Sequence, residues 1–303
     1  MTFSIVARCP SSGALGVAVS TAVPAVGATC PYVRPGVGAV STQSWVNPYL
    51  AIKALDLLAA GCTVREALDE VLRTDAQADM RQLGIVAENG TALSWTGKQC
   101  TGWAGECTGP DYAIQGNMLT GQETLDAMQT AFLRSVGMKF EERLLLVLEA
   151  GQANGGDKRG RQSASLIVYL DEPYPYLDLR VDEHADPVRE LRRVFGVAVV
   201  QLLPFIESMP TGAGHAGVPT KEVRDMLMLP PSQRPGMPAI PPAQVDLLQT
   251  ISGTDFTQDR VEANLHAFRP ILAEIHKLRE LDLANIHPAV IFDPTAPWRG
   301  SDK

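Results

Sequence analysis

The stretch TFSIVARCPSSGALGVAVST, residues 2–21, decides how the chain begins to fold. Apolar side chains at Phe3, Ile5 and Ala7 alternate with Thr2, Ser4 and Val6, which is the period of a β-strand. The segment 9–13 supplies Pro, Ser and Gly, the residues of tight turns, and residues 14–21 return as a second strand. The sequence therefore predicts an antiparallel hairpin at the start of the chain.

Hairpins and helix pairs follow one another along the chain. Asn47-Pro48 opens a helix that runs to residue 61, because Asn is a good N-cap and Pro suits the first helical turn. The other expected elements are a strand at 38–43, a helix at 64–73, a hairpin at 83–96 around Asn89-Gly90, helices at 121–135 and 141–150, strands at 163–169 and 177–181, and a helix at 186–208. This order favours antiparallel sheets covered by helices over a parallel doubly wound sheet. The predicted fold class is α+β, a four-layer αββα sandwich.

Composition excludes several classes of protein. The 303 residues carry 26 basic and 34 acidic side chains, a net charge of −8, whereas a nucleic-acid binder usually has a basic excess. Five cysteines, an odd number without CxxC spacing, indicate neither a disulfide framework nor a zinc site. No apolar run reaches the ~18 residues that cross a bilayer, and the N-terminus lacks the regions of a signal peptide. We expect a cytoplasmic protein without nucleic-acid or membrane partners.

The composition changes near residue 210 and divides the chain into three parts. Eight prolines fall between residues 210 and 242. Proline fixes φ and removes a donor, so this stretch is predicted to be an extended linker with little secondary structure, or a disordered one. Residues 1–209 form the predicted αββα domain, and residues 243–303 return to helical periodicity.

The first domain offers an unusual choice of catalytic base. Glycine-rich nucleotide motifs, HExxH and GxSxG are absent, and His184 is the only histidine before residue 210. One base remains that needs no side chain, the α-amino group, whose ordinary pKa of about 7.7–8.0 suits general-base work. Threonine is small, so removal of Met1 is expected to leave Thr2 with a free amine that activates its own hydroxyl. The alternative is that Thr2 is simply a β-branched strand residue.

Several motifs in the first domain resemble the DUF1028 family. They are residues 1–8, the strand GVGAVSTQ (36–43), RQLG (81–84), QGN (115–117), GGDKRG (155–160) and Gln162-Ser163. The resemblance implies an αββα fold like that of N-terminal nucleophile (Ntn) hydrolases, which cleave amide bonds, and it strengthens the assignment of Thr2 as nucleophile. Cys9 departs from the pattern, where an acidic residue is expected, so any charge that tunes the amine from that position is lost.

The segment 155–160 joins a predicted helix to a strand and carries candidate site residues. Its two leading glycines permit close backbone approach, Asp157 is suited to orient the amine, and Arg159 to hold a substrate carboxylate. A solvated turn is the alternative interpretation of the same residues.

Polar residues at predicted strand ends complete the candidate site. Asn117 is a candidate oxyanion-hole amide, or else a turn-forming residue. Gln43 and Ser41 lie at the end of a strand and are candidates to line the cleft, and Ser163 begins a strand and is expected to face Thr2. Trp45 and Trp103 are expected to pack in the core rather than to wall a pocket.

The C-terminal region carries an apolar helix face. Apolar residues recur every three to four positions between Val261 and Leu278, and the motifs LRELD (278–282), NIHP (285–288) and FDP (292–294) follow. This pattern is similar to the GatC-like accessory subunit of amidotransferases. The resemblance implies that residues 243–303 dock an amidase-signature enzyme. Packing on the chain's own domain, or on another copy in a homo-oligomer, is the alternative.

Two functional hypotheses result. In the first, the chain is an Ntn-type hydrolase of a small amide, ureido or imide bond, with Thr2, Asn117 and Asp157 catalytic, Gln43, Arg159 and Ser163 binding substrate, and no metal or organic cofactor. In the second, the chain is a non-catalytic accessory subunit that docks a separate amidase through its tail. The two are compatible in one protein.

Overall fold

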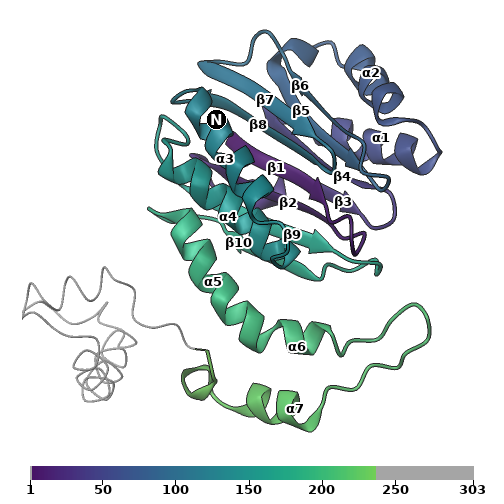
Figure 1. Cartoon of the computed structure of the whole chain (residues 1–303), viewed down its shortest axis with the longest axis vertical. Helices are drawn as coiled ribbons and strands as arrows, with labels where there is room; N and C mark the ends of the chain where they lie inside the picture. Colours follow the sequence, from purple (N-terminus) through teal and green to yellow (C-terminus); the bar gives the residue numbers. More distant parts are fainter. Residues whose placement is uncertain (1, 237–303) are drawn as a thin grey trace, which may run out of the picture. The chain divides into compact units, whose positions relative to one another are not determined.

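A computed structural model describes residues 2–236, in which ten strands form two antiparallel sheets (Figure 1). One sheet contains β1 (Thr2–Arg8), β2 (Leu15–Thr21), β7 (Trp103–Gly109), β8 (Tyr112–Leu119), β9 (Ser163–Tyr169) and β10 (Leu177–Val181). The other contains β3 (Pro31–Arg34), β4 (Gly38–Ser44), β5 (Arg81–Ala87) and β6 (Ala92–Thr96). The strand orders are β10-β9-β2-β1-β8-β7 and β3-β4-β5-β6. The chain's first strand therefore lies in the middle of the larger sheet.

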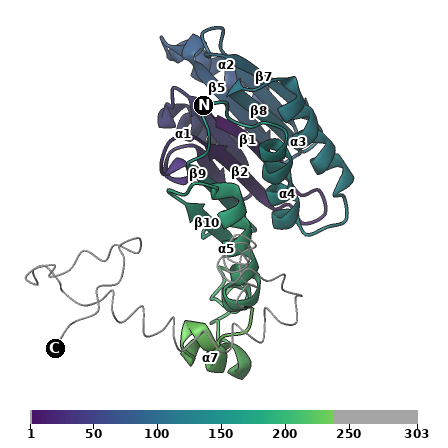
Figure 2. The ribbon, with the colours of Figure 1, turned by 90° about the vertical axis from the view of Figure 1, so that its left-hand side faces the viewer.

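Helices cover the outer face of each sheet. The α-helices are α1 (Pro48–Ala59), α2 (Val64–Thr74), α3 (Gln122–Arg134), α4 (Phe140–Ala153), α5 (Pro187–Gln201), α6 (Leu203–Ile206) and α7 (Lys221–Met228), and 3-10 helices span Val26–Ala28, Ala78–Met80 and Pro231–Gln233. Helices α1 and α2 contact the four-stranded sheet, whereas α3, α4 and α5 contact the six-stranded sheet. Figures 1 and 2 show these two groups on opposite sides of the paired sheets.

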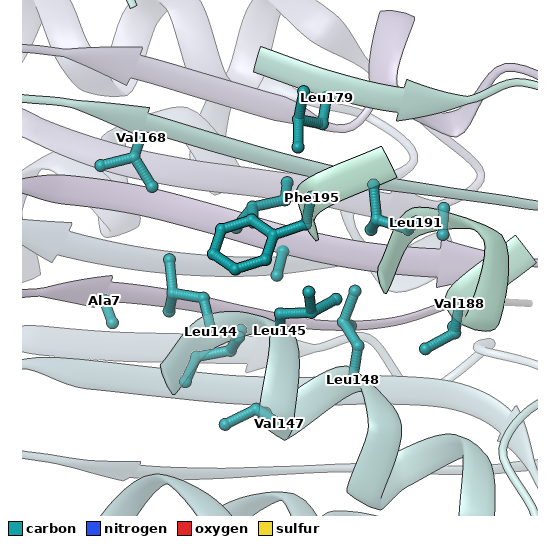
Figure 3. Close-up of a cluster of buried hydrophobic side chains, with 14 of the residues drawn as sticks. Ala7, Leu144, Leu145, Val147, Leu148, Val168, Leu179, Val188, Leu191 and Phe195 are labelled. Atoms are coloured by element: carbon teal, nitrogen blue, oxygen red, sulfur yellow. The ribbon is translucent and has the colours of Figure 1, made fainter. Parts of the chain in front are cut away.

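Three of the four apolar clusters formed by the described residues separate these layers. Side chains such as Leu144, Leu148, Leu191 and Phe195 fill the space between the six-stranded sheet and its helices, where Ala7 marks the sheet side (Figure 3). A second cluster lies between α1, α2 and the four-stranded sheet. The third, which contains Val6, Val17, Ala39, Val86 and Ala113, lies between the two sheets. Apolar burial of this kind is the main stabilising contribution to such a layered fold.

The mixed α+β character expected from the sequence is confirmed, and many local signals act as predicted. Strands β1 and β2 form the N-terminal hairpin, in register from Thr2–Thr21 to Arg8–Leu15. Asn47 caps α1 by accepting the Tyr49 amide, and Pro48 is its first residue. Thr63 and Glu66 form a capping box at α2, with both reciprocal hydrogen bonds present.

Other predictions are corrected by the structure. The single helix expected at 186–208 is broken into α5 and α6, because Pro204 lacks the N–H that would continue the hydrogen-bond ladder. Strands β3, β7 and β8 were not expected.

The proline-rich segment is also more ordered than predicted. It contains α7, which is capped by the Thr220 hydroxyl, and a 3-10 helix at Pro231–Gln233. The predicted helical tail at 243–303, its GatC-like motifs and the end of the linker at 242 lie outside the described residues. No helix within residues 2–236 is long and apolar enough to cross a membrane.

Candidate functional site

The candidate residues gather at one end of the paired sheets. In the six-stranded sheet, β1 begins there at Thr2, β2 ends at Thr21 and β8 ends just beyond Asn117. Thr2 lies in register between Thr21 and Asn117, so the three side chains share one face of the sheet. That face is the inner one. Side chains alternate along a strand, so Thr2 and Val6 of β1 point to the same face, and Val6 packs in the cluster between the sheets.

Thr2 is almost fully buried and has close polar neighbours. Its Oγ1 lies 3.2 Å from Oγ1 of Thr21, and its side chain is enclosed between the two sheets. From the opposite sheet, Gln43 Nε2 donates to the Thr2 carbonyl at 3.4 Å. The nucleophile candidate therefore sits at the edge of a polar interior and not on an open sheet edge.

The loop that contains Asp157 crosses the start of β1. On one side the loop pairs with the end of β8. There Leu119 and Asp157 form an isolated antiparallel β-bridge, and Thr120 N donates to Gly156 O at 3.2 Å. On the other side Asp157 Oδ2 accepts the Ala22 amide, just after β2, at 3.1 Å. Because β1 lies between β8 and β2, a loop that joins both neighbours must pass the first residue of β1. The sheet topology thus puts a buried carboxylate beside the N-terminal end of the strand.

Backbone geometry explains the glycines of this loop. Gly155 and Gly156 have φ of 104° and 58°, in the region that favours glycine. The turn that follows is fixed by Asp157 itself, whose Oδ1 accepts the Arg159 amide at 2.8 Å, while Arg159 Nη2 lies 3.3 Å from Oδ2. Arg159 is 38% exposed, so its guanidinium reaches the surface while its partner carboxylate stays buried.

A chain of buried side-chain hydrogen bonds links the two sheets behind Thr2. Ser4 donates to Gln43 Oε1 at 2.7 Å and accepts from Gln115 Nε2 at 2.6 Å. Gln43 Nε2 in turn donates to Gln82 Oε1 at 2.8 Å. All four side chains are buried, and polar groups in that setting are stable only when their hydrogen bonds are satisfied. This network holds the end of the inter-sheet space in one arrangement.

The orientation of Gln82 determines that of Asn117. Gln82 Nε2 donates to the carbonyls of Gly116 and Gly105 at 2.8 and 3.1 Å, and carbonyls only accept. Oε1 of Gln82 therefore faces Asn117, whose Nδ2 donates to it at 2.9 Å. The Asn117 amide nitrogen, expected to serve as an oxyanion donor, is thus turned toward Gln82 and retains one further N–H.

The structure places Ser163 differently from the expectation. It lies opposite Thr21 on β9, so that Thr21 stands between it and Thr2. Its hydroxyl donates to Val23 O at 2.6 Å and accepts from Val26 N at 3.1 Å. Ser163 does not face Thr2 because β2 lies between their strands, and its hydroxyl holds the 23–26 turn. Ser41, by contrast, lies in the interior network, where its Oγ is 3.1 Å from Ser4 Oγ and donates to Gln43 Oε1 at 3.3 Å.

Backbone strain concentrates at this end of the molecule. Among the described residues, four non-glycine residues have positive φ: Ala25, Ser44, Asp111 and Met118. Ala25 follows β2, Ser44 ends β4, and Met118 comes directly after Asn117. Residues held in such conformations cluster at functional sites, where the surrounding structure keeps them in place. Three of the four residues thus lie at the end of the sheets where β1 begins.

Neither of two cysteines, Cys9 and Cys30, is placed to act in the chemistry of the site. Cys9, where an acidic residue was expected to tune the amine, follows the last residue of β1 and so lies at the opposite end of the strand from Thr2. Cys30 contacts the site's own end of β4, since its carbonyl accepts the Thr42 amide at 3.0 Å. Burial raises the pKa of the Cys30 thiol to about 12, which keeps it protonated and unreactive.

The two tryptophans behave differently from each other. Trp103 packs against the main apolar cluster, as expected. Trp45 was also expected in the core, but its side chain is 61% exposed because the strained turn at Ser44 directs it outward. Within residues 2–236 there is no group of three or more His, Cys, Asp or Glu side chains arranged to hold a metal ion.

Sequence reasoning missed Gln82 and Gln115 as members of the site. Each stands in a strand whose other residues are mainly apolar or small, and each side chain is fully buried. A long polar side chain inside a predicted apolar strand is the available signal, because a buried amide must find partners.

Two facing sheets characterise this α+β protein, and its candidate site lies at the polar, strained end where β1 begins. The chain belongs to the family described as a family of unknown function (DUF1028), whose model matches residues 2–191. It is similar to the crystal structure of protein SPO2555 from Silicibacter pomeroyi, a DUF1028 protein, with 27% identity over 73% of this chain and 96% of that one and a TM-score of 0.67. Anbu (ancestral beta-subunit) from Yersinia bercovieri is a far more distant neighbour, 15% identical over 65% of this chain and 95% of that one, with a TM-score of 0.34. No curated protein sequence matches the chain.

Proposed function

We propose that the protein is an Ntn-type hydrolase that cleaves a small amide, ureido or imide bond with Thr2 as nucleophile after removal of Met1. The observation that carries the proposal is the register of Thr2 between Thr21 and Asn117, with the Asp157 loop crossing the start of its strand. An α-amine and a hydroxyl on one residue, beside a buried carboxylate and amides, is a constellation suited to acyl transfer.

The reaction divides into two steps. In the first, the Thr2 amine takes the proton of the Thr2 hydroxyl as Oγ1 attacks the substrate carbonyl, and then passes that proton to the leaving nitrogen as the C–N bond breaks. The product is an ester on Thr2. In the second step the amine takes a proton from water, the hydroxide equivalent attacks the ester, and the proton returns to Oγ1 as the acid leaves.

The surrounding residues have separate roles in this proposal. Asp157 orients the amine, Arg159 holds a substrate carboxylate, and Gln43 holds the Thr2 backbone through its carbonyl. The negative charge that develops on the substrate oxygen is stabilised by a backbone amide or by the remaining N–H of Asn117. Ser163 supports the 23–26 turn that borders the site. No cofactor takes part.

Two forms of the same chain test the proposal. Protein with and without Met1 is prepared by varying methionine aminopeptidase during expression and is checked by intact mass. Each form is treated with a β-lactone, which acylates an activated hydroxyl, and the modified residue is identified by peptide mapping. We expect modification of Thr2 only in the form without Met1.

Variants complete the test with a panel of chromogenic anilides that carry a carboxylate. Thr2→Ala should abolish both modification and turnover, whereas Thr2→Ser, which keeps the hydroxyl, should retain both. Urea unfolding shows whether Thr2→Ala keeps the fold. Turnover in folded Thr2→Ala, or equal modification of the form that retains Met1, would contradict the mechanism.

A further inference from the structure

Trp45 has a large apolar side chain that is exposed to solvent. It is 61% exposed, although it directly follows β4 and is only two residues from Gln43, whose side chain is fully buried. Exposed apolar side chains occur elsewhere on the described surface, for example Tyr49 at 76%, but Trp45 stands beside the polar interior in which Gln43 contacts Thr2.

The backbone before Trp45 is strained in a way that produces this exposure. Ser44 has φ of 69°, in the left-handed region that L-residues with a Cβ rarely adopt. Without that reversal, β4 would continue and alternate its side chains between the two faces of the sheet. The strained conformation of Ser44 therefore directs the Trp45 side chain toward solvent.

Four residues hold the turn in place and form what we name the Arg81–Asp75 bracket: Asn47, Asp75, Met80 and Arg81. Arg81 Nη1 donates to Trp45 O at 2.7 Å, and Trp45 N donates to Met80 O at 3.3 Å. Arg81 Nε donates to Asp75 Oδ2 at 2.8 Å, and the two side chains are only 15% and 9% exposed. Asn47 Nδ2 also donates to Asp75 Oδ2, at 3.2 Å. Both sides of Trp45 are thus fixed while its ring is free.

Strand connectivity places Trp45 near the Thr2 end of the molecule. Trp45 extends the four-stranded sheet, whose Gln43 contacts the Thr2 carbonyl, whereas Arg159 belongs to the loop at the end of the six-stranded sheet. The two residues therefore border the Thr2 end of the molecule from different sheets. A substrate bound at Thr2 with its carboxylate toward Arg159 would present its other half to the side of Trp45.

We propose that Trp45 is the binding platform for an aromatic or extended alkyl acyl group, so that the substrate is an N-acylated amino acid with an apolar acyl part. This inference rests on the proposed function for the place of the scissile bond, between the two halves of the ligand. The indole face supplies apolar contact, and the strained, bracketed turn supplies a fixed geometry that loses little freedom on binding.

Binding to the Thr2→Ala protein tests this without turnover. The two probes are N-benzoylglycine and N-acetylglycine, which share the carboxylate and the amide and differ in the acyl group. We expect N-benzoylglycine to bind about tenfold more tightly, as measured by calorimetry. Adding Trp45→Ala should remove this preference and leave N-acetylglycine binding unchanged, whereas Trp45→Phe should keep most of it.

Phe205→Ala is the matched control, because Phe205 is another partly exposed aromatic residue, on α6, and its loss should leave the preference intact. Equal weakening of both probes by Trp45→Ala would overturn the proposal and indicate that Trp45 only supports the fold. So would equal affinities of the two probes, absence of binding at millimolar concentration, or a change of mass in light scattering on Trp45→Ala, which would identify a contact between copies. A persistent benzoyl preference in a protein without Thr2-dependent turnover would refute the hydrolase but not the platform.

Discussion

Asn117 donates its side-chain amide to Gln82 Oε1 over 2.9 Å, so an amide on the six-stranded sheet is held by one on the four-stranded sheet. Gln82 is itself fixed by two backbone carbonyls. The neighbour of Thr2 is therefore positioned from across the inter-sheet space, and the arrangement at the site depends on how the two sheets meet.

Gln82→Leu should destabilise the protein strongly. The substitution removes the acceptor of Asn117 Nδ2, one acceptor of Gln43 Nε2 and the side-chain donor to two backbone carbonyls. Each buried polar group that is left unsatisfied costs about 1–3 kcal/mol. We expect a loss of at least about 3 kcal/mol in the free energy of unfolding, measured in urea. Ser94→Ala is the control, because Ser94 makes one partly buried bond to Gln115 and its loss should cost about 1 kcal/mol. Equal losses in the free energy of unfolding for the two variants would show that Gln82 contributes no more to stability than Ser94 does.

Asn117→Asp should shift the pH dependence of Thr2 acylation by a β-lactone in protein without Met1. A carboxylate next to the amine favours the protonated amine and raises its pKa, so the midpoint of the rate profile should rise by about one pH unit. Asn117→Leu removes the polar group and serves as the comparison, with no upward shift. If position 117 lies too far from the amine for a charge to act on it, Asn117→Asp will leave the midpoint unchanged, which would contradict the proposed arrangement.

Local signals in the sequence are sufficient for much of the fold. The alternation around Phe3 and Ile5 and the Asn47-Pro48 cap each act over a few residues, and both form as predicted. Strand β8 was missed because it contains Gly116 and a buried run, Tyr112–Asn117, that shows no period of two. The predicted site residues Thr2, Asn117 and Asp157 do come together at one end of the sheets.

The partners of those residues could not be found in the same way. The bond from Asn117 to Gln82 spans 35 positions and two sheets, so it depends on the stacking of layers and not on any local pattern. The exposure of Trp45 likewise depends on Ser44 φ and on Arg81, which no periodicity reveals. Residue types at strand ends indicate which groups are available, whereas sheet packing decides which of them meet.

Gly84→Ala should disrupt the inter-sheet network by overpacking. A Cβ at Gly84 would overlap the side-chain amide of Gln115, which lies against the glycine from the opposing sheet. Overpacking of this kind typically costs 1–3 kcal/mol, and we expect about 2 kcal/mol in urea unfolding. Gly196→Ala is the matched control, since nothing lies within 4 Å of a Cβ there and α5 is a helix, so stability should rise by up to about 1 kcal/mol. A neutral Gly84→Ala would mean that the Gln115 amide, or the sheets themselves, can move aside without loss of stability.

Asp75→Asn should weaken the Arg81–Asp75 bracket in a way that depends on pH. Burial alone would raise the pKa of Asp75, but hydrogen bonds from Arg81, the Gln77 amide and Asn47 outweigh it and lower the pKa. A carboxyl whose pKa is lowered by folding stabilises the protein above its unfolded value of about 3.9, and that contribution disappears as the pH falls through the folded value.

We therefore expect Asp75→Asn to cost about 2 kcal/mol at pH 7 and progressively less below about pH 4, measured by urea unfolding at several pH values. Asp56→Asn is the control, because the Asp56 pair with Arg34 is 61% and 40% exposed and should contribute less than about 1 kcal/mol. A loss that stays constant down to pH 3 would show that the bracket acts through shape and not through the charge of Asp75. In that case the emission of Trp45, measured as the difference between the wild-type and Trp45→Phe proteins, should also be insensitive to acid while the protein stays folded.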